Sequence, residues 1–281
     1  MIIFKEPADL SLLLLKKAKE NVATGFVPTM GALHNGHIGL VQKAVDENDI
    51  VICSIFVNPS QFNDPKDFEK YPRTLDEDVY LLEQAGCDVL FMPATGAIYP
   101  NGIEPAQHYE LGDLENVLEG KYRPGHFQGV CQVVHRLLDI VGPGKLYLGQ
   151  KDFQQCLVIK KLIGFLGLAT ELVISPTLRE PDGLAMSSRN LRLTSDERTI
   201  ATAIYQALIQ IKNNINHTKL ATLKENAITD LTAKGFTVDY VEVADRKDLD
   251  LKNEYDGNDE LVALAAAYLN NVRLIDNVII N

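Results

Sequence analysis

The stretch "VPTMGALHNGH" (Val27–His37) decides how the first part of this chain folds. It begins inside an apolar run, "GFVPT" (25–29), and passes through a Gly-rich turn into a helical pattern that starts near Gly36. A strand that gives way to a helix in this manner is typical of α/β proteins. The turn also carries His34 and His37, and histidine is seldom fully buried in a core. The turn therefore predicts a site for a polar or anionic ligand.

Further apolar runs alternate with helical patterns through the first two-thirds of the chain. We expect strands at 25–29, 49–58, 87–93, 145–149 and 170–176, and helices at 36–47, 75–85, 127–141 and 153–164. Thr74 and Glu77 form a capping-box pattern before the second of these helices, and Gly86 follows it as a stop signal. Near-continuous apolar strands alternating with helices predict a Rossmann-like, doubly wound parallel sheet, in which ligands bind beyond the carboxyl ends of the strands.

The pattern changes after about residue 176. Thr194 and Glu197 form a second capping-box pattern, and the residue pair Asn270-Asn271 suits a hairpin turn. The expected elements are helices at 194–214 and 219–234 and strands at 237–245, 260–269 and 272–280. We therefore expect a Rossmann-like domain (1–177) that binds the ligands and a smaller α+β C-terminal domain (178–281) that closes over the site.

Composition limits the function. The 281-residue chain has 27 basic and 38 acidic residues, a formal net charge of −11, which disfavours general binding to nucleic acids or anionic membranes. The four cysteines are scattered through apolar runs without a C-x-x-C pair, which favours reduced, buried thiols in a cytoplasmic protein. The segment "LSLLLLKKAKE" is too short to span a membrane and predicts an amphipathic surface helix.

Two donor-rich segments suit an anion. A helix that begins near Gly36 offers backbone N–H groups and a partial positive charge, and His34 and His37 add donors beside it. A helix cap with one satisfied histidine, or a weak metal pair, would explain the same two residues. The segment "MSSR" (186–189) combines two hydroxyls with a guanidinium and could hold a polyphosphate, or could be an ordinary turn.

Four other segments carry polar side chains at the expected strand or helix ends. Each also has a plain structural explanation, as a surface ion pair, a turn or the acidic start of a helix. The candidates are Lys151 and Asp152 for phosphate and ribose, Asn58 and Gln61 for hydroxyls or a carboxylate, Arg123 and His126 for an anion, and Asp76, Glu77 and Asp78 for magnesium. Because such segments follow parallel strands, we expect several of them at one edge of the sheet.

The combination of "PTMGALHNGH" with "MSSRN" resembles the nucleotidyltransferase superfamily that uses HIGH-type and KMSKS-type loops. The segments "FVNPSQF", "YPRT", "RPGHF", "GQKDFQQ" and "REPDGLAMSSRN" narrow the resemblance to the pantothenate synthetase (pantoate–β-alanine ligase) family. The resemblance covers about residues 26–193. The C-terminal third agrees in length and apparent architecture but carries little diagnostic sequence.

The resemblance implies a homodimeric, AMP-forming ligase that joins pantoate to β-alanine. Pantoate would attack the α-phosphorus of ATP, and β-alanine would then displace AMP from the pantoyl-adenylate, with Mg²⁺ accompanying ATP. Gln61 and Gln155 would bind pantoate, while His34, His37 and Lys151 would stabilise charge on the phosphates. The residues implied for ATP binding are Met30, Gly31, Ala32, Leu33, His34, Asn35, Gly36, His37, Gly149, Gln150, Lys151, Asp152, Leu178, Met186, Ser187, Ser188 and Arg189.

Two positions depart from the family pattern, and two rival functions follow from the same motifs. Gln150 stands where Glu is frequent and Pro181 where a small residue is common, which puts the local loop geometry in question. One rival is a nucleotidyltransferase acting on a phosphorylated acceptor, although the neutral amides of Gln61 and Gln155 suit a phosphate poorly. The other is a nucleotide-binding regulatory module without catalysis.

Overall fold

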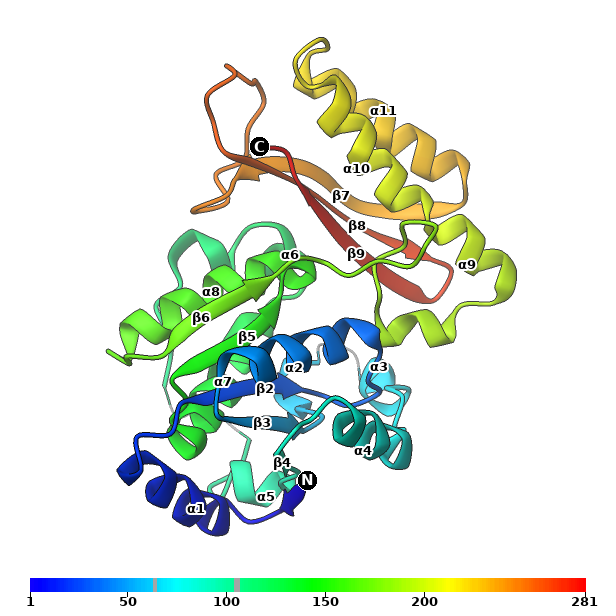
Figure 1. Ribbon diagram of the computed structural model, residues 1–281. Coiled ribbons are helices and arrows are strands. Elements are labelled where there is room, and N and C mark those ends of the chain that lie inside the picture. The colour runs from blue at the N-terminus through cyan, green and yellow to red at the C-terminus, as the bar shows by residue number, and fades with distance from the viewer. Residues whose placement is uncertain (63–64, 104–106) are drawn as a thin grey trace. The chain divides into compact units, whose positions relative to one another are not determined.

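The computed structural model describes residues 1–62, 65–103 and 107–281 (Figure 1). The chain folds into two compact units. The first comprises Met1–Gly149 and Val158–Pro176, and the second comprises Gln150–Leu157 and Thr177–Asn281. Each unit contains its own sheet, so each is described by itself.

The first unit is built on a parallel sheet in the order β1-β4-β3-β2-β5-β6. Its strands are β1 (Ile2–Phe4), β2 (Thr24–Thr29), β3 (Ile50–Ile55), β4 (Val89–Phe91), β5 (Lys145–Gly149) and β6 (Glu171–Ser175). The chain moves outward from β2 through β3 to β4, then returns to place β5 on the other side of β2. The order of the strands therefore reverses between β2 and β5, and open α/β sheets bind ligands at such a switch point.

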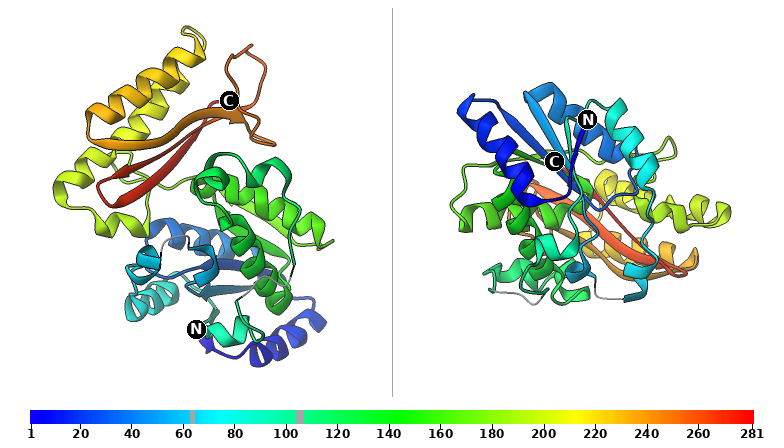
Figure 2. Two further views of the ribbon diagram at one scale, coloured as in Figure 1. Left: turned by 180° about the vertical axis from the view of Figure 1, so that it is seen from behind. Right: turned by 90° about the horizontal axis from the view of Figure 1, so that it is seen from below.

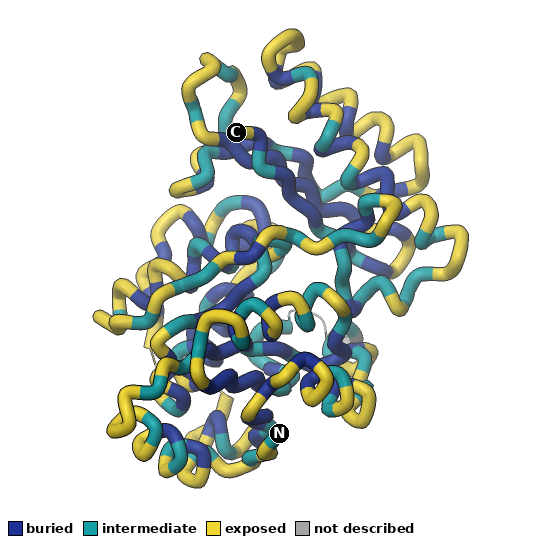
Figure 3. Tube along the Cα trace, in the orientation of Figure 1, coloured by how far each residue is buried: buried dark blue, intermediate teal, exposed yellow. Residues whose placement is uncertain are grey.

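Both faces of this sheet are covered, which explains why its central strands are apolar throughout. Phe26 and Val27 are neighbours on β2 that point to opposite faces, and each is 0% exposed. On one face, Val27 and Cys53 pack with residues of α2 and α4, including Leu40 and Leu82. Helices lie on both sides of the sheet (Figures 1 and 2), and Figure 3 shows the buried residues running along the strands. The expected doubly wound Rossmann-like sheet is confirmed.

Short and long helices connect these strands. The α-helices up to residue 165 are α1 (Pro7–Lys19), α2 (Asn35–Glu47), α3 (Pro65–Glu69), α4 (Leu75–Gln84), α5 (Thr95–Ile98), α6 (Leu118–Tyr122), α7 (His126–Val141) and α8 (Phe153–Phe165). The 3₁₀ turns are η1 (Pro59–Gln61), η2 (Gly112–Glu115), η3 (Gln150–Asp152) and η4 (Ser188–Arg192). In α1, Leu10 and Leu14 are buried whereas Leu12 and Leu15 are exposed, as expected for an amphipathic surface helix.

The second unit contains a small antiparallel sheet in the order β7-β8-β9. Its elements are α9 (Ser195–Ala201), α10 (Ala203–Asn214), α11 (Leu220–Ala233), β7 (Phe236–Asp245), β8 (Leu261–Leu269) and β9 (Val272–Ile279). Leu208 of α10 and Leu231 of α11 share one apolar cluster with Val243 and Ala265 of the sheet, so the two helices cover one face of it. The smaller α+β architecture expected for the C-terminal part of the chain is confirmed.

Several local expectations need correction. The expected long helix 194–214 is divided into α9 and α10 at Thr202. The capping box at Thr194 and Glu197 is present, with Glu197 N–H donating to Thr194 Oγ1 at 3.3 Å. The capping box at Thr74 is wrong, because the Thr74 hydroxyl instead donates to Asp78 Oδ1 at 3.0 Å.

Two further observations complete the fold. The edge strand β1 was not expected, because three residues are too few to produce a readable apolar pattern. Over the described ranges, no helix combines the length and the apolar character that crossing a membrane would require.

Candidate active site

The loop between β2 and α2 contains two residues with a left-handed backbone conformation, which few residue types adopt without strain. Gly31 has φ +79° and Ala32 has φ +49°, so two successive residues lie in the left-handed region. Gly31 N–H donates to Thr29 Oγ1 at 3.2 Å, and that hydroxyl donates to Ser54 O at 2.7 Å. The loop is thereby tied to β2 and to β3 at its start.

Asp78 of α4 holds the middle of the same loop. Its carboxylate accepts the N–H groups of Ala32 at 2.9 Å and Leu33 at 2.8 Å, and the residue is 1% exposed. A Cβ on Gly31 would lie 3.0 Å from Asp78 Oδ2, so a larger residue would press on the carboxylate. The sequence suggested only a magnesium ligand or a helix-start acid here. Asp78 does lie in the first turn of α4, as the helix-start interpretation predicts. Its carboxylate is also a buried acceptor for the loop's backbone, and the "RTLDED" segment gave no signal for that role.

The two histidines form a reciprocal cap at the start of α2. Gly36 N–H donates to His34 Nδ1 at 3.1 Å, and His34 N–H donates to His37 Nδ1 at 3.4 Å. Their ring centroids are 4.0 Å apart. Because Nδ1 acts as an acceptor in both rings, the neutral imidazoles carry their proton on Nε2. The helix-cap interpretation is therefore correct for both residues.

A second polar group follows β3. Asn58 is 1% exposed, and its Oδ1 accepts the hydroxyl of Tyr99 at 2.7 Å. Its Nδ2 donates to Gln61 Oε1 at 3.2 Å, while Gln61 Nε2 lies 3.0 Å from Met30 Sδ. Asn58 is therefore bonded within the protein at both ends of its amide, which the sequence did not predict. It orients the amide of Gln61, which is half-buried beside Met30.

The "RPGHF" segment supports Gln61 from the other side. His126 Nδ1 lies 2.8 Å from the backbone oxygen of Gln61, and Arg123 Nη2 donates to the same oxygen at 3.3 Å. His126 is buried at the start of α7. The helix approaches so closely that a Cβ on Gly129 would collide with Ser60 O. Arg123 and His126 thus fix the backbone of Gln61, and their predicted binding of an anion stays a prediction.

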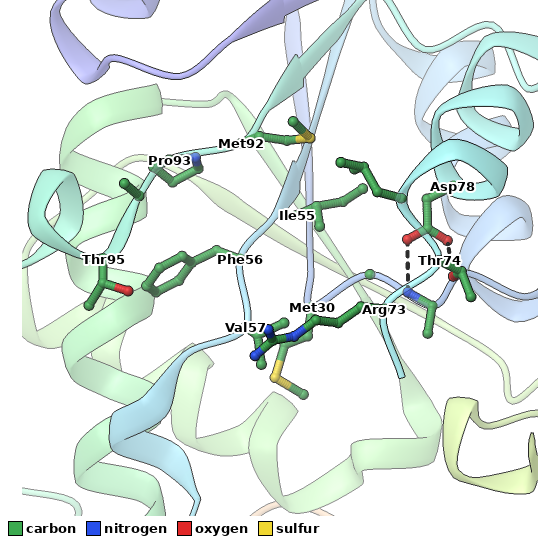
Figure 4. A pocket seen from close by; sticks show the side chains of 14 residues that line it. Met30, Ile55, Phe56, Val57, Arg73, Thr74, Asp78, Met92, Pro93 and Thr95 are labelled. Atoms are coloured by element: carbon green, nitrogen blue, oxygen red, sulfur yellow. Dashed lines mark hydrogen bonds between the residues drawn. The ribbon is translucent and has the colours of Figure 1, made fainter. Parts of the chain in front are cut away.

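A cavity of about 320 Å³ opens beside this loop (Figure 4). Its walls are mostly apolar, and its polar groups include Arg73, Thr74, Asp78 and Thr95. The complete lining is Met30, Gly31, Ala32, Ile55, Phe56, Val57, Arg73, Thr74, Leu75, Asp78, Met92, Pro93, Ala94 and Thr95. Figure 4 shows Met30 and Arg73 at one side and Met92 at the opposite side. Concave, mainly apolar spaces with a few polar groups are typical of small-molecule sites.

The second unit carries the segment that follows β5. Lys151 Nζ lies 4.0 Å from Asp152 Oδ1, with 18% and 50% of the two side chains exposed. Gln150 Nε2 donates to Asn277 Oδ1 at 3.0 Å, so the unusual glutamine has a partner within the unit. Gly149 ends β5, and Gln155 is half-buried in the first turn of α8.

The segment 178–189 begins with a short hairpin in the second unit. Arg179 and Ala185 form an antiparallel bridge, and Gly183 N–H donates to Glu180 O at 2.9 Å across the turn. Pro181 occupies the second position of that turn, which its fixed φ favours, so the departure from the family pattern is accommodated. Leu178 is 47% exposed. Its carbonyl accepts the N–H of Met186 at 3.1 Å.

The hairpin leads into the Ser-Ser-Arg turn. Ser187 Oγ accepts the N–H of Arg189 at 3.3 Å and so caps η4, while Ser188 is buried. The "SSRN" segment is thus an ordered turn at the start of a 3₁₀ helix. Its Ser187 hydroxyl and the Arg189 guanidinium are of the types that bind phosphate oxygens.

Neither thiol chemistry nor a preformed metal site is present within the part of the chain that is described. The four cysteines are buried and form no disulfide, as expected for thiols in apolar runs. Burial raises the pKa of Cys87 to about 11 and that of Cys131 to about 12. Such thiols are poor nucleophiles at neutral pH. Among the described residues, no three His, Cys, Asp or Glu side chains gather into a potential metal site.

The structure therefore brings the expected residues together in two groups. The first unit contains the loop from Met30 to His37 together with Gln61. The second unit contains Gln150–Asp152, Gln155 and the segment 178–189. In each group a residue that the sequence did not predict for this role holds the backbone of a predicted ligand-binding segment. Asp78 holds Ala32 in the first unit, and Asn277 holds Gln150 in the second.

Comparison with known proteins gives one consistent answer. The family model described as pantoate-beta-alanine ligase matches residues 2–279. The pantothenate synthetase of Cytophaga hutchinsonii is 42% identical over 100% of this chain and 99% of its own length. That of Porphyromonas gingivalis is 44% identical over 99% of both chains.

Solved structures agree with these relatives. The crystal structure of pantothenate synthetase from Thermus thermophilus has a TM-score of 0.92 at 38% identity, covering 100% of this chain and 99% of its own. The pantoate-beta-alanine ligase of Francisella tularensis, complexed with beta-gamma ATP and beta-alanine, has a TM-score of 0.85 at 40% identity. It covers 99% of this chain and 97% of its own.

Proposed function

The chain belongs to the pantoate–β-alanine ligase family of AMP-forming, carbon–nitrogen bond-forming enzymes, and we propose that it works through a pantoyl-adenylate intermediate. In the first step a carboxylate oxygen of pantoate attacks the α-phosphorus of ATP, and the α–β bond breaks to release pyrophosphate. In the second step the amine of β-alanine attacks the acyl carbon, loses a proton, and displaces AMP. Neither step needs a protein nucleophile, so catalysis consists of positioning and charge stabilisation.

The observation that carries this proposal is the tautomer of the two histidines. Backbone N–H groups donate to Nδ1 of His34 and His37, so each neutral ring carries its proton on Nε2 beside the N-terminus of α2. Negative charge grows on the β-phosphate as the α–β bond breaks, and donors already aligned need no reorganisation at that moment. Met30 to His37 would therefore line the ATP site, and the histidines would act mainly on the leaving pyrophosphate.

Gln61 would bind pantoate through its amide. The neighbouring Asn58 and the Arg123–His126 pair hold the side chain and the backbone of Gln61, so its geometry is set before a ligand arrives. Neutral amides can donate to the carboxylate and accept from the hydroxyls of pantoate. We propose the same role for Gln155.

The remaining nucleotide contacts would come from the second unit. Lys151 would neutralise a phosphate and Asp152 would accept from the ribose, with Gly149 and Gln150 completing that segment. Leu178 would contact adenine through its backbone, and Met186 to Arg189 would bind the phosphates. Mg²⁺ prefers phosphate oxygens with one or two carboxylates, so we expect it to arrive with ATP, and Asp152 is a partly exposed carboxylate able to meet it.

Three expectations about organisation belong to this proposal. The ligand-binding domain would comprise residues 1–177 and the smaller domain residues 178–281. The enzyme would be a homodimer, which light scattering on the 31.2 kDa chain can test against a monomer. A cytoplasmic location is supported by four buried cysteines that form no disulfide.

Pyrophosphate release tests the proposed order of steps. The enzyme is mixed with ATP and pantoate in the absence of β-alanine, and pyrophosphate is measured on a rapid time scale. An adenylate intermediate predicts a burst of about one equivalent per site. Release with a phosphorylated acceptor but not with pantoate would identify the rival nucleotidyltransferase. ATP binding without turnover of any acceptor would favour a regulatory module.

A further inference from the structure

Two adjacent residues of β9, Asp276 and Asn277, are polar in a strand that is otherwise apolar at its buried positions. Asp276 is 5% exposed and Asn277 is 2% exposed, while the buried neighbours include Leu274 and Val278. Successive strand residues point to opposite faces, so the two side chains leave the strand in opposite directions. Burying polar side chains is unfavourable unless they gain specific partners.

Asn277 holds the turn that follows β5. Its Nδ2 donates to the backbone oxygens of Gln150 at 2.9 Å and Lys151 at 2.8 Å. Its Oδ1 accepts from Gln150 Nε2 at 3.0 Å. The two bonds to backbone oxygens fix the main chain from which the side chain of Lys151 extends, and the third holds the side chain of Gln150.

Asp276 holds the hairpin that leads to the Ser-Ser-Arg turn. Its two carboxylate oxygens accept from Arg179 Nη1 at 2.6 Å and Nη2 at 3.0 Å. Arg179 also donates to Gly183 O at 3.1 Å and to Asn277 O at 3.0 Å, and it lies 3.9 Å from the ring centroid of Tyr205. The guanidinium therefore connects the hairpin to Asp276 and Asn277 of β9, and Asn277 also holds the Gln150–Lys151 turn.

We propose that Asp276 and Asn277 are positioning residues that set the phosphate-binding segments of the second unit relative to each other. The inference rests on the proposed function, because that function places Lys151 and Arg189 at the phosphates of ATP. One dipeptide anchors both segments, so a shift of β9 or the loss of either side chain changes the spacing of the two cations. Misplacement of a binding group by about 1 Å can reduce a rate by about a hundredfold.

The sharpest test is Asn277→Asp. It keeps the size of the side chain but replaces the two N–H donors with a carboxylate that faces two backbone oxygens. We measure by calorimetry the affinity for an ATP analogue with a methylene group between the α- and β-phosphorus atoms, which cannot release pyrophosphate. We expect the variant to bind at least tenfold more weakly, and Asp276→Asn to weaken binding in the same direction.

Arg273→Ala is the matched control. Arg273 lies on the same strand, and its Nε donates to Asp239 Oδ2 of β7 at 2.8 Å, so this bond joins two strands of the small sheet. We expect the variant to lose stability while its affinity for the analogue stays within twofold of wild type. A purely structural role for Asn277 would produce the same result in Asn277→Asp.

Each outcome has a defined meaning. Wild-type-like affinity in Asn277→Asp overturns the inference, whatever the ligase activity. Weak binding by Asn277→Asp with near-wild-type binding by Arg273→Ala supports it, together with a raised KM for ATP and an unchanged KM for β-alanine. If the aspartate variant does not fold, Asn277→Ala is read by the same criteria. A wild type that binds the analogue but makes no pantothenate contradicts the proposed function and leaves the positioning role standing.

Discussion

Two buried aspartates hold the two groups of expected active-site residues, and they do so by different chemistry. Asp78 accepts hydrogen bonds from two backbone N–H groups in the loop that carries His34 and His37. Asp276 instead accepts hydrogen bonds from the guanidinium of Arg179, which also donates to two backbone oxygens. The first is a direct contact with the loop's main chain. The second acts through an intermediate cation. The difference predicts that loss of Asp276 leaves an uncompensated charge, whereas loss of Asp78 leaves unsatisfied amides.

The largest effect is expected from Asp276→Ala. Removing one partner of a buried ion pair costs about 3–5 kcal/mol, because the remaining charge is desolvated without compensation. Only 18% of the Arg179 side chain is exposed. The free energy of unfolding, measured by urea denaturation, should fall by that amount. A loss below about 1 kcal/mol, which is the range of a solvent-exposed ion pair, would contradict the conclusion that Arg179 and Asp276 form a buried, stabilising pair.

Two substitutions of His37 distinguish its role in capping α2 from its proposed role in catalysis. His37→Ala removes both the Nδ1 acceptor and the Nε2 donor, and we expect kcat to fall about 100- to 1,000-fold, as for other losses of a transition-state donor. His37→Asn can place Oδ1 near the position of Nδ1 and accept the His34 N–H again, so it should restore about 1 kcal/mol of stability relative to alanine, the net value of one hydrogen bond, without restoring kcat.

Steady-state kinetics and urea denaturation check the two halves of this prediction. The KM for pantoate should change little in either variant. Recovery of kcat in His37→Asn would mean that the cap alone matters. A rise in the KM for pantoate with kcat unchanged would assign His37 to the wrong substrate.

Asp78→Asn tests the direct contact with the loop. The amide keeps the shape but can accept with only one of its two groups, so one N–H of Ala32 or Leu33 loses its partner. We expect a loss of about 1–3 kcal/mol in unfolding free energy, together with a lower kcat because His34 follows directly in the loop. Unfolding and turnover are measured on the same preparation. Stability lost with kcat intact would show that Asp78 supports the fold without positioning the histidines.

The smallest effect is expected at the far end of α2. Hydrogen bonds from Lys43, Lys145 and Tyr147 lower the pKa of Glu47 to about 2. A folded-state pKa below the unfolded value of about 4.3 means that Glu47 stabilises the protein above about pH 4.5. That contribution is lost as the pH falls toward 2.

The stability difference between wild type and Glu47→Gln should show this pH dependence. The difference in urea midpoint between wild type and variant should be constant from about pH 7 to about pH 5 and should shrink below about pH 4.5. A difference that grows on acidification would contradict the assignment. Turnover at neutral pH should change less than in Asp78→Asn, because Glu47 lies at the end of α2 opposite the histidines.

The sequence predicted those parts of the fold that depend on local pattern. The strand 145–149 has the expected bounds, and the Thr194 capping box is present, because both depend on neighbouring residues. The same capping pattern failed at Thr74, where a buried carboxylate one turn later competes for the hydroxyl. A short motif therefore predicts a structure only when no tertiary partner offers a better bond.

The candidate site shows the same limit. The segments expected to bind ligands could be picked out from their residue types, and the family comparison supports the activity. Their supports could not be found in this way, because Asp78 is 46 residues from Ala32 and Asn277 is 127 residues from Gln150. The sequence also does not reveal that Asn58, predicted with Gln61 as a ligand-reading amide, is 1% exposed and bonded to Tyr99.

Isotope exchange tests the central claim most directly. If pantoate and ATP react to form an enzyme-bound adenylate, labelled pyrophosphate will enter ATP in a reaction that requires pantoate but not β-alanine. We predict that wild type catalyses this exchange and that His37→Ala slows it at least as much as it slows the overall ligation. Exchange that requires β-alanine, or that proceeds without pantoate, would contradict the adenylate mechanism.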